Sequence, residues 1–198
     1  MTDDALLEAL RERAVAESST PDRWGVLRPL RPPVTETELA RAEQELGVRL
    51  PPLLRRIYAE VADGGFGPEK SHRLYSIRSG YTGDEDTLVS LYRVFTGPTP
   101  PDVVVWPRSL VPFCDWGCAI WSCIDVRTEA ASIVTADNER FFDTPHDLRS
   151  WVQAWVDRVD FWKEMFDDGP GRPGINPFTK KPIVIAGPRI PTGKPWRE

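Results

Sequence analysis

Apolar positions recur with helical spacing in the first third of the chain and predict three helices. The first covers residues 3–17. The second follows a capping box formed by Thr35 and Glu38, with Gly47 placed to end it. The third begins at the prolines of residues 51–52 and must end at the glycine cluster that starts at residue 64. The buried faces predicted by this spacing are Leu6, Leu10 and Ala14; Leu39, Ala42 and Leu46; and Leu53, Leu54, Ile57, Tyr58 and Val61.

The period then changes to that of strands, from residue 72 to residue 143. Strands are predicted at residues 73–78, 103–106, 110–113, 118–125, 132–136 and 140–142. The connections after residue 118 are too short for crossover helices, so neighbouring strands should pair antiparallel. Both faces of segment 118–125 are apolar, which is typical of a central strand covered on each side.

A last helix is predicted from a capping box that begins at Thr144, and it should end at Asp168-Gly169-Pro170. Its aromatic stripe indicates core packing. The remaining 30 residues are rich in Gly and Pro and read as an extended tail with a short edge strand at 182–186. The predicted organisation is an N-terminal helix and Pro-rich connector (1–32), a central domain (33–168) and a tail (169–198).

Charge is distributed unevenly along the chain. The 198 residues are 40% hydrophobic and 28% charged, with a net charge of -5. Residues 169–198 hold six basic side chains and one acidic one, a net of +5, so the first 168 hold 19 basic and 29 acidic ones, a net of -10. Such a body repels nucleic acid and attracts basic partners. The opposite charge of the tail favours a position across the acidic surface.

The apolar runs and the N-terminus bear on where the protein acts and on whether it enters a membrane. These runs are too short to cross a bilayer, and the acidic N-terminus leads into no apolar signal region. Three cysteines imply no disulfide framework. We therefore expect a cytoplasmic protein that does not associate with membranes.

The candidate catalytic and metal sites are weak. Cys114, Cys118 and Cys123 lack zinc-ligand spacing, and His72 and His146 lie in other segments, so the thiols are predicted to be core residues. No predicted strand leads into the glycine cluster at 64–67, as one does into a phosphate-binding loop, and the carboxylates of 84–86 lack calcium-site spacing. We expect no metal, no cofactor and no enzymatic activity.

The order of motifs resembles the SUKH superfamily (SMI/KNR type), which includes a yeast cell-wall assembly regulator. The resemblance covers about residues 33–158 and rests on Leu46-Gly47 through Leu50-Pro51, the Asp63-Gly64-Gly65 turn, the run from Pro112-Phe113 to Gly117, and Asp125. The family turn usually carries Asn where this chain has Asp63. The matching positions, interpreted as fold determinants, are Gly47, Pro51, Gly64, Gly65, Pro112, Phe113, Gly117 and Asp125.

The resemblance implies a single α+β domain with an antiparallel sheet of five to six strands and with helices at its edge and on one face. It also implies an immunity protein that binds and neutralises a cognate toxin, with a basic nuclease or nucleic-acid-modifying toxin expected as partner. From charge and loop position, the predicted contact residues are Tyr81, Asp84, Glu85, Asp86, Tyr92, Asp102, Trp116, Trp121, Asp137 and Glu139.

Two other hypotheses stay open at this point. The chain could be an intracellular interaction or regulatory module without a toxin partner. It could also be an enzyme, if a pocket joined a histidine to one of the cysteines. The oligomeric state and the position of the tail are not determined by the sequence.

Overall fold

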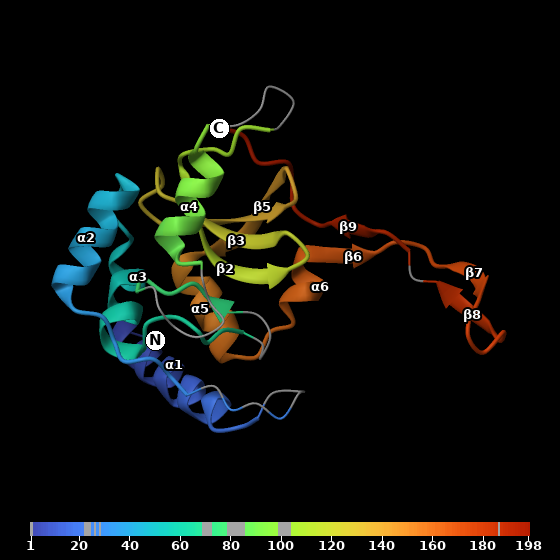
Figure 1. Cartoon of the computed structure of the whole chain (residues 1–198), viewed down its shortest axis with the longest axis horizontal. Coiled ribbons are helices and arrows are strands. Elements are labelled where there is room, and N and C mark those ends of the chain that lie inside the picture. Colours follow the sequence, from blue (N-terminus) through green and yellow to red (C-terminus); the bar gives the residue numbers. More distant parts are fainter. Residues whose placement is uncertain are drawn as a thin grey trace.

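The computed structural model describes residues 2–21, 25, 27, 29–68, 73–78, 86–98, 104–185 and 187–198. Its centre is a five-stranded antiparallel sheet in the order β1-β2-β3-β4-β5 (Figure 1). The strands are β1 (Arg73–Leu74), β2 (Leu110–Gly117), β3 (Ile120–Asp125), β4 (Ser132–Asp137) and β5 (Arg140–Asp147). The expected α+β class and antiparallel sheet are confirmed, and β3 is the central strand as predicted.

The N-terminal helices form where local signals predict them. They are α1 (Asp3–Ser18), α2 (Glu36–Leu46) and α3 (Pro52–Arg56), the last continuing as a π-helical turn, η1 (Ile57–Val61). The Thr35–Glu38 capping box is present, and Gly47 ends α2 with a φ of 72°. Every apolar position predicted to be buried in these helices is buried.

The main core lies between one face of the sheet and the helices. Helix α1 packs on α5 (Leu148–Val156), and Leu6, Leu7 and Leu10 belong to the same buried cluster as Trp151 and Trp155. The N-terminal helix therefore shares its core with the central domain. A smaller cluster centred on Trp106, Leu110 and Cys123 covers the opposite face of the sheet.

Three sequence expectations are corrected. Helix α4 (Leu88–Thr96) occupies a stretch expected to be strand-like, and its capping box of Thr87 and Ser90 was missed. The described part of segment 103–106, residues 104–106, is not a strand. The segment predicted as one last helix forms two helices, α5 and α6 (Phe161–Met165). Helix α5 is capped by Asp147 rather than Thr144, and Arg158, with a φ of 62°, lies between the two helices.

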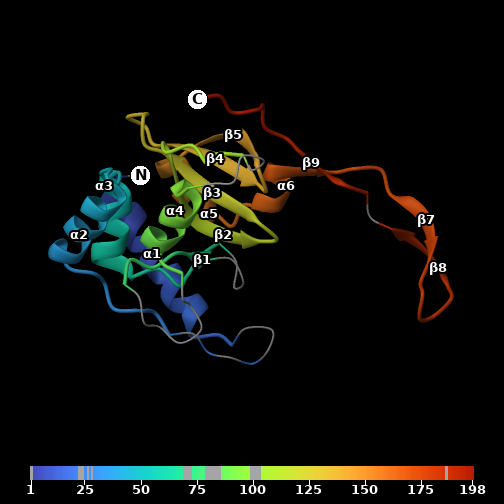
Figure 2. The same ribbon diagram turned by 45° about the horizontal axis from the view of Figure 1, so that its top comes forward.

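The tail contains more regular structure than predicted. Strand β6 (Phe166–Asp168) pairs with β9 (Arg189–Pro191), and β7 (Arg172–Ile175) pairs with β8 (Pro182–Ile185). Figures 1 and 2 show the β7–β8 hairpin projecting far from the rest of the molecule. The final residues return to the body, where an isolated bridge joins Pro195 to Phe142 of β5. The hairpin therefore does not lie across its own body, whereas the C-terminal end does.

Candidate binding surface

Two turns lie side by side at one end of the sheet. The β2–β3 turn consists of Cys118 and Ala119, with φ values of 52° and 59°. The backbone N–H of Asn138, in the β4–β5 turn, donates to the Ala119 carbonyl oxygen at 2.8 Å. Two consecutive residues with positive φ are typical of a tight hairpin turn that favours Asn and Gly, so Cys118 and Ala119 hold a strained backbone.

The acidic residues of the β4–β5 turn are not equally accessible. Glu139 is exposed, whereas Asp137 is only 8% exposed. The Asp137 carboxylate forms an ion pair with Arg140 and accepts a hydrogen bond from the Asn138 side chain at 2.9 Å. Glu139 is thus the accessible carboxylate of this turn, whereas the charge of Asp137 is largely buried and already paired with Arg140.

Trp121 lies on the other face of the sheet from Asp137. In the β3–β4 register, Trp121 is opposite Ala136 while Ile120 is opposite Asp137, and successive residues of a strand point to opposite faces. The Trp121 ring is half-buried, and its indole N–H donates to the Tyr75 hydroxyl at 3.0 Å. Its ring centroid is 4.9 Å from that of Phe95 and 5.9 Å from that of Trp106. Trp121 is therefore one member of a partly exposed aromatic cluster.

Two other predicted contact residues lie in the core. The Trp116 side chain is 1% exposed, and its indole N–H donates to the Ser122 hydroxyl at 2.8 Å. The Tyr92 side chain is 6% exposed, and its hydroxyl donates to the Arg108 carbonyl oxygen. Both rings are therefore buried, in contrast to the surface positions expected of them. Asp86 is exposed; Tyr81, Asp84, Glu85 and Asp102 lie outside the described residues.

Asp125 joins the sheet to the C-terminal end of the chain. Its carboxylate accepts hydrogen bonds from the Arg127 guanidinium at 3.0 and 2.7 Å and from the Trp196 indole N–H at 3.3 Å. Burial by itself would raise the pKa of Asp125, but the hydrogen bonds from Arg127 and Trp196 together bring this pKa below its ordinary value. The Arg127 guanidinium also lies 4.9 Å from the Trp196 ring centroid.

Trp196 had not been singled out from the sequence. It completes the smaller aromatic cluster, with its ring centroid 6.0 Å from that of Phe141. The signal that could have identified it is a lone tryptophan in a polar, Gly/Pro-rich tail, because a large apolar side chain in such a segment needs a surface to cover it.

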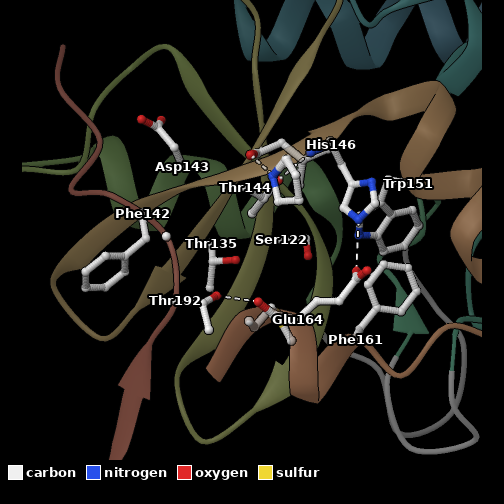
Figure 3. A pocket seen from close by; sticks show the side chains of 14 residues that line it. Ser122, Thr135, Phe142, Asp143, Thr144, His146, Trp151, Phe161, Glu164 and Thr192 are labelled. Atoms are coloured by element: carbon white, nitrogen blue, oxygen red, sulfur yellow. Dashed lines mark hydrogen bonds and ion pairs between the residues drawn. The ribbon is translucent and has the colours of Figure 1, made fainter. Parts of the chain in front are cut away.

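A small cavity lies beneath the C-terminal segment, between the sheet and α6 (Figure 3). His146 and Glu164 both line it and contact each other directly, with 2.9 Å between Nε2 and Oε2. The Thr192 hydroxyl donates to the Glu164 backbone carbonyl oxygen, and the buried Thr135 hydroxyl has no hydrogen-bond partner in the described part of the chain. The volume is about 20 Å³, enough for one water molecule and too little for a substrate.

No hydrogen bond joins His146 to a cysteine within the described residues. None of the three lines the cavity, and His72 lies outside the described residues. Cys114 and Cys123 are fully buried, as predicted, and burial raises the pKa of both thiols well above the ordinary value. Cys118 is exposed in the β2–β3 turn, so its prediction as a core thiol is wrong. Within the described residues, no three His, Cys, Asp or Glu side chains are placed to hold a metal ion.

A polar groove of about 450 Å³ separates α2 from α4. Arg93 pairs with Glu45 at 3.3 Å, and Arg78 pairs with the fully buried Asp63 at 3.2 Å. The Asp63 carboxylate also accepts a hydrogen bond from the Ile77 backbone N–H at 2.6 Å. Asp63, which stands where the family usually has Asn, therefore connects the glycine turn to the segment after β1. The groove is lined by paired charges of both signs and is not an acidic surface.

Comparison with known proteins supports the family assignment. The model of the SMI1 / KNR4 family (SUKH-1) matches residues 33–161. No curated protein matches the chain. Within the described residues, no helix combines the length and the apolar character needed to span a bilayer. The match covers more than half of the sequence and includes all five strands of the central sheet, and the chain therefore belongs to the SMI1/KNR4 family (SUKH-1).

Proposed function

We propose that this protein is an immunity protein that acts in the cytoplasm by binding and blocking a cognate toxin. The SUKH family is generally associated with immunity proteins. The observation that carries the proposal within this chain is its charge division, because the first 168 residues have a net charge of -10. A toxin that acts on nucleic acid needs a cationic surface for phosphates, and an acidic protein competes directly for such a surface.

The proposed contacts combine acidic side chains with a few aromatic ones. The charges steer the encounter, and desolvated aromatic rings supply most of the affinity. Of the residues that can take part, Trp121 is half-buried, and Asp86 and Glu139 are exposed. Segment 81–86 places one tyrosine beside a run of carboxylates, and Asp102 adds another negative charge. The proposed interface therefore comprises Tyr81, Asp84, Glu85, Asp86, Asp102, Trp121 and Glu139.

The test uses the product of a toxin-domain gene adjacent to the gene for this chain. We expect the two proteins to co-purify and this chain to protect cells that produce the toxin. The variant D84N/E85Q/D86N should weaken binding and its dependence on salt. The control E12Q/E129Q/D157N changes exposed acidic residues elsewhere by the same net charge and should bind as the unaltered chain does.

The outcomes separate the hypotheses. Equal affinity and equal salt dependence of the two triple variants would remove segment 84–86 from the interface. If no toxin-domain gene is adjacent, or if its product neither binds this chain nor is neutralised by it, the immunity proposal fails and the alternative of an intracellular interaction module is favoured.

A further inference from the structure

The basic tail forms an arm whose base is fixed to the body. Strands β6 and β9 pair Phe166 with Pro191 and Asp168 with Arg189, and the Gly169 N–H donates to the Pro188 carbonyl oxygen at 3.0 Å. A Cβ atom on Gly187 would overlap the backbone of Gly169, so the two strands of the arm cross where only glycine fits. The base of the arm is thus tightly paired, and the β7–β8 hairpin beyond it projects away from the body (Figures 1 and 2).

The hairpin ends in an ordered turn that presents an aromatic ring. The side-chain oxygen of Asn176 accepts hydrogen bonds from the backbone N–H groups of Phe178 and Thr179, both at 2.9 Å. The Asn176 N–H donates to the Lys181 carbonyl oxygen at 2.9 Å, which closes the turn. Phe178 is 91% exposed at its tip. Because the turn backbone is already fixed and phenylalanine has only two side-chain torsions, ordering this ring on binding costs little entropy, which suits an anchor residue at an interface.

The hairpin lacks a core of its own. Ile175 and Val184 are 66% and 78% exposed, and Ile183 and Ile185 are also exposed. An isolated two-stranded hairpin is marginally stable in water, and this one projects away from the body (Figures 1 and 2). Apolar side chains gathered on such an element indicate a surface that another molecule covers.

The positive charge of the hairpin indicates which kind of surface could cover it. Residues 172–185 carry three basic side chains, Arg172, Lys180 and Lys181, and no acidic one. A basic toxin would repel this hairpin, and so would the hairpin of a second copy. The body of a second copy, with its net charge of -10 over the first 168 residues, would attract it.

We propose that the β7–β8 hairpin docks on the acidic body of a second copy of this chain, in a two-fold dimer held by reciprocal exchange of the two arms. Each arm then places its positive charge on the partner's negative body, which offsets the repulsion between the two bodies. Phe178 at the tip is the central anchor, and Val184, nearer the base of the hairpin, is covered as well. This dimer does not depend on the identity of the toxin.

Sedimentation or light scattering of the full chain over a range of concentrations tests the proposal. We expect the mass of two chains. F178S/V184S should raise the dimer dissociation constant by at least ~30-fold, as expected for loss of an aromatic anchor. The control V94S removes a valine of α4 that is 69% exposed and should leave the dimer unchanged. A monomeric full chain, or a dimer that F178S/V184S leaves intact, overturns the proposal.

A second measurement locates the docked hairpin. Carbodiimide joins Lys180 or Lys181 to carboxylates in direct contact, and a mixture of ¹⁵N-labelled and unlabelled chains distinguishes links between copies from links within one copy. We expect links between copies that end in residues 2–168, and we expect K180E/K181E to dissociate the dimer while the matched reversal R49E/R158E does not. Links confined to one copy, or binding of the lysines to nucleic acid by a chain that stays monomeric, contradict the arm exchange.

Discussion

The indole N–H of Trp196 donates a hydrogen bond to the carboxylate of Asp125, which lies 71 residues earlier in the chain. Asp125 ends the central strand and belongs to the sequence pattern by which the family is recognised, whereas Trp196 lies beyond the family match. The last residues of the chain continue the sheet beside β5, since the Asp143 N–H donates to the Lys194 carbonyl oxygen at 2.8 Å. The C-terminal end is therefore part of the folded body.

Trp196→Ala should release this end. The variant loses the hydrogen bond to Asp125, the ring contact with Phe141 and the cation–π contact with Arg127. We expect a loss of about 2 kcal/mol in the free energy of unfolding and faster hydrogen exchange at the Asp143 amide. Lys194→Ala, which keeps the backbone acceptor, is the control. Unchanged exchange at Asp143 in Trp196→Ala would show that Trp196 does not hold the segment.

The two hydroxyls of the cavity should respond in opposite ways to removal. Thr135→Val deletes a buried hydroxyl that has no partner in the described residues, at nearly constant volume, and should be neutral or stabilising by up to about 1 kcal/mol. Ser122→Ala removes the hydroxyl that accepts a hydrogen bond from the buried Trp116 indole N–H and should destabilise by about 1–3 kcal/mol. Urea unfolding measures both changes. Destabilisation of similar size in both variants would contradict this account.

The β2–β3 turn stores strain that a better turn sequence relieves. Cys118→Asn with Ala119→Gly introduces the pair preferred at two successive positions of positive φ, and it should stabilise the chain by about 1–2 kcal/mol. Cys118→Ser removes the thiol while it keeps the same backbone demand and should change the unfolding midpoint little. A double variant no more stable than Cys118→Ser would place the strain elsewhere.

Asp147 should contribute to acid sensitivity. Its carboxylate accepts hydrogen bonds at the N-terminus of α5 from the Ser150 backbone N–H and hydroxyl, both at 2.7 Å, and these bonds lower the pKa of Asp147. Because the folded pKa is the lower one, the stability due to this charge is present above about pH 4 and is lost as pH falls through the folded value. Asp147→Asn keeps the cap and removes the charge.

Thermal unfolding from pH 2 to pH 7 measures this contribution. We expect Asp147→Asn to be less stable than the unaltered chain by up to about 1 kcal/mol at pH 7, and the difference to disappear at the acid end. Ser150→Ala keeps the backbone donor and should give an intermediate profile. A constant difference between the unaltered chain and Asp147→Asn at every pH would show that the charge is not the cause.

The sequence predicts well those elements whose structure is determined by residues close together in the chain. The capping box of α2 needs only residues 35–38, and the alternation along β3 places Trp121 and Ile120 on opposite faces without knowledge of their neighbours. Helix α4 was missed because Leu88–Thr96 is apolar and partly β-branched, and because its cap uses Ser90 where a capping box usually has Glu or Gln.

The predicted contact residues fare less well, since exposure depends on distant segments. Trp116 and Trp121 are similar in sequence context, yet α6 covers Trp116, with the Phe161 ring centroid 5.5 Å away, while Trp121 stays half-exposed. From the sequence, Asp137 is expected to be an exposed carboxylate in a turn, but in the structure it forms an ion pair with Arg140. The burial of Trp116 has no local signal, because it is set by a helix far away in the chain, whereas the Asp137–Arg140 pair is local but depends on the path of the β4–β5 turn.

The affinity of this chain for the product of an adjacent toxin-domain gene, measured by titration calorimetry at low and high salt, tests the central claim most directly. The account predicts tight binding that weakens steeply as salt rises and that weakens in D84N/E85Q/D86N but not in E12Q/E129Q/D157N. Absence of binding at low salt, or binding that is independent of salt and of both triple variants, would contradict it.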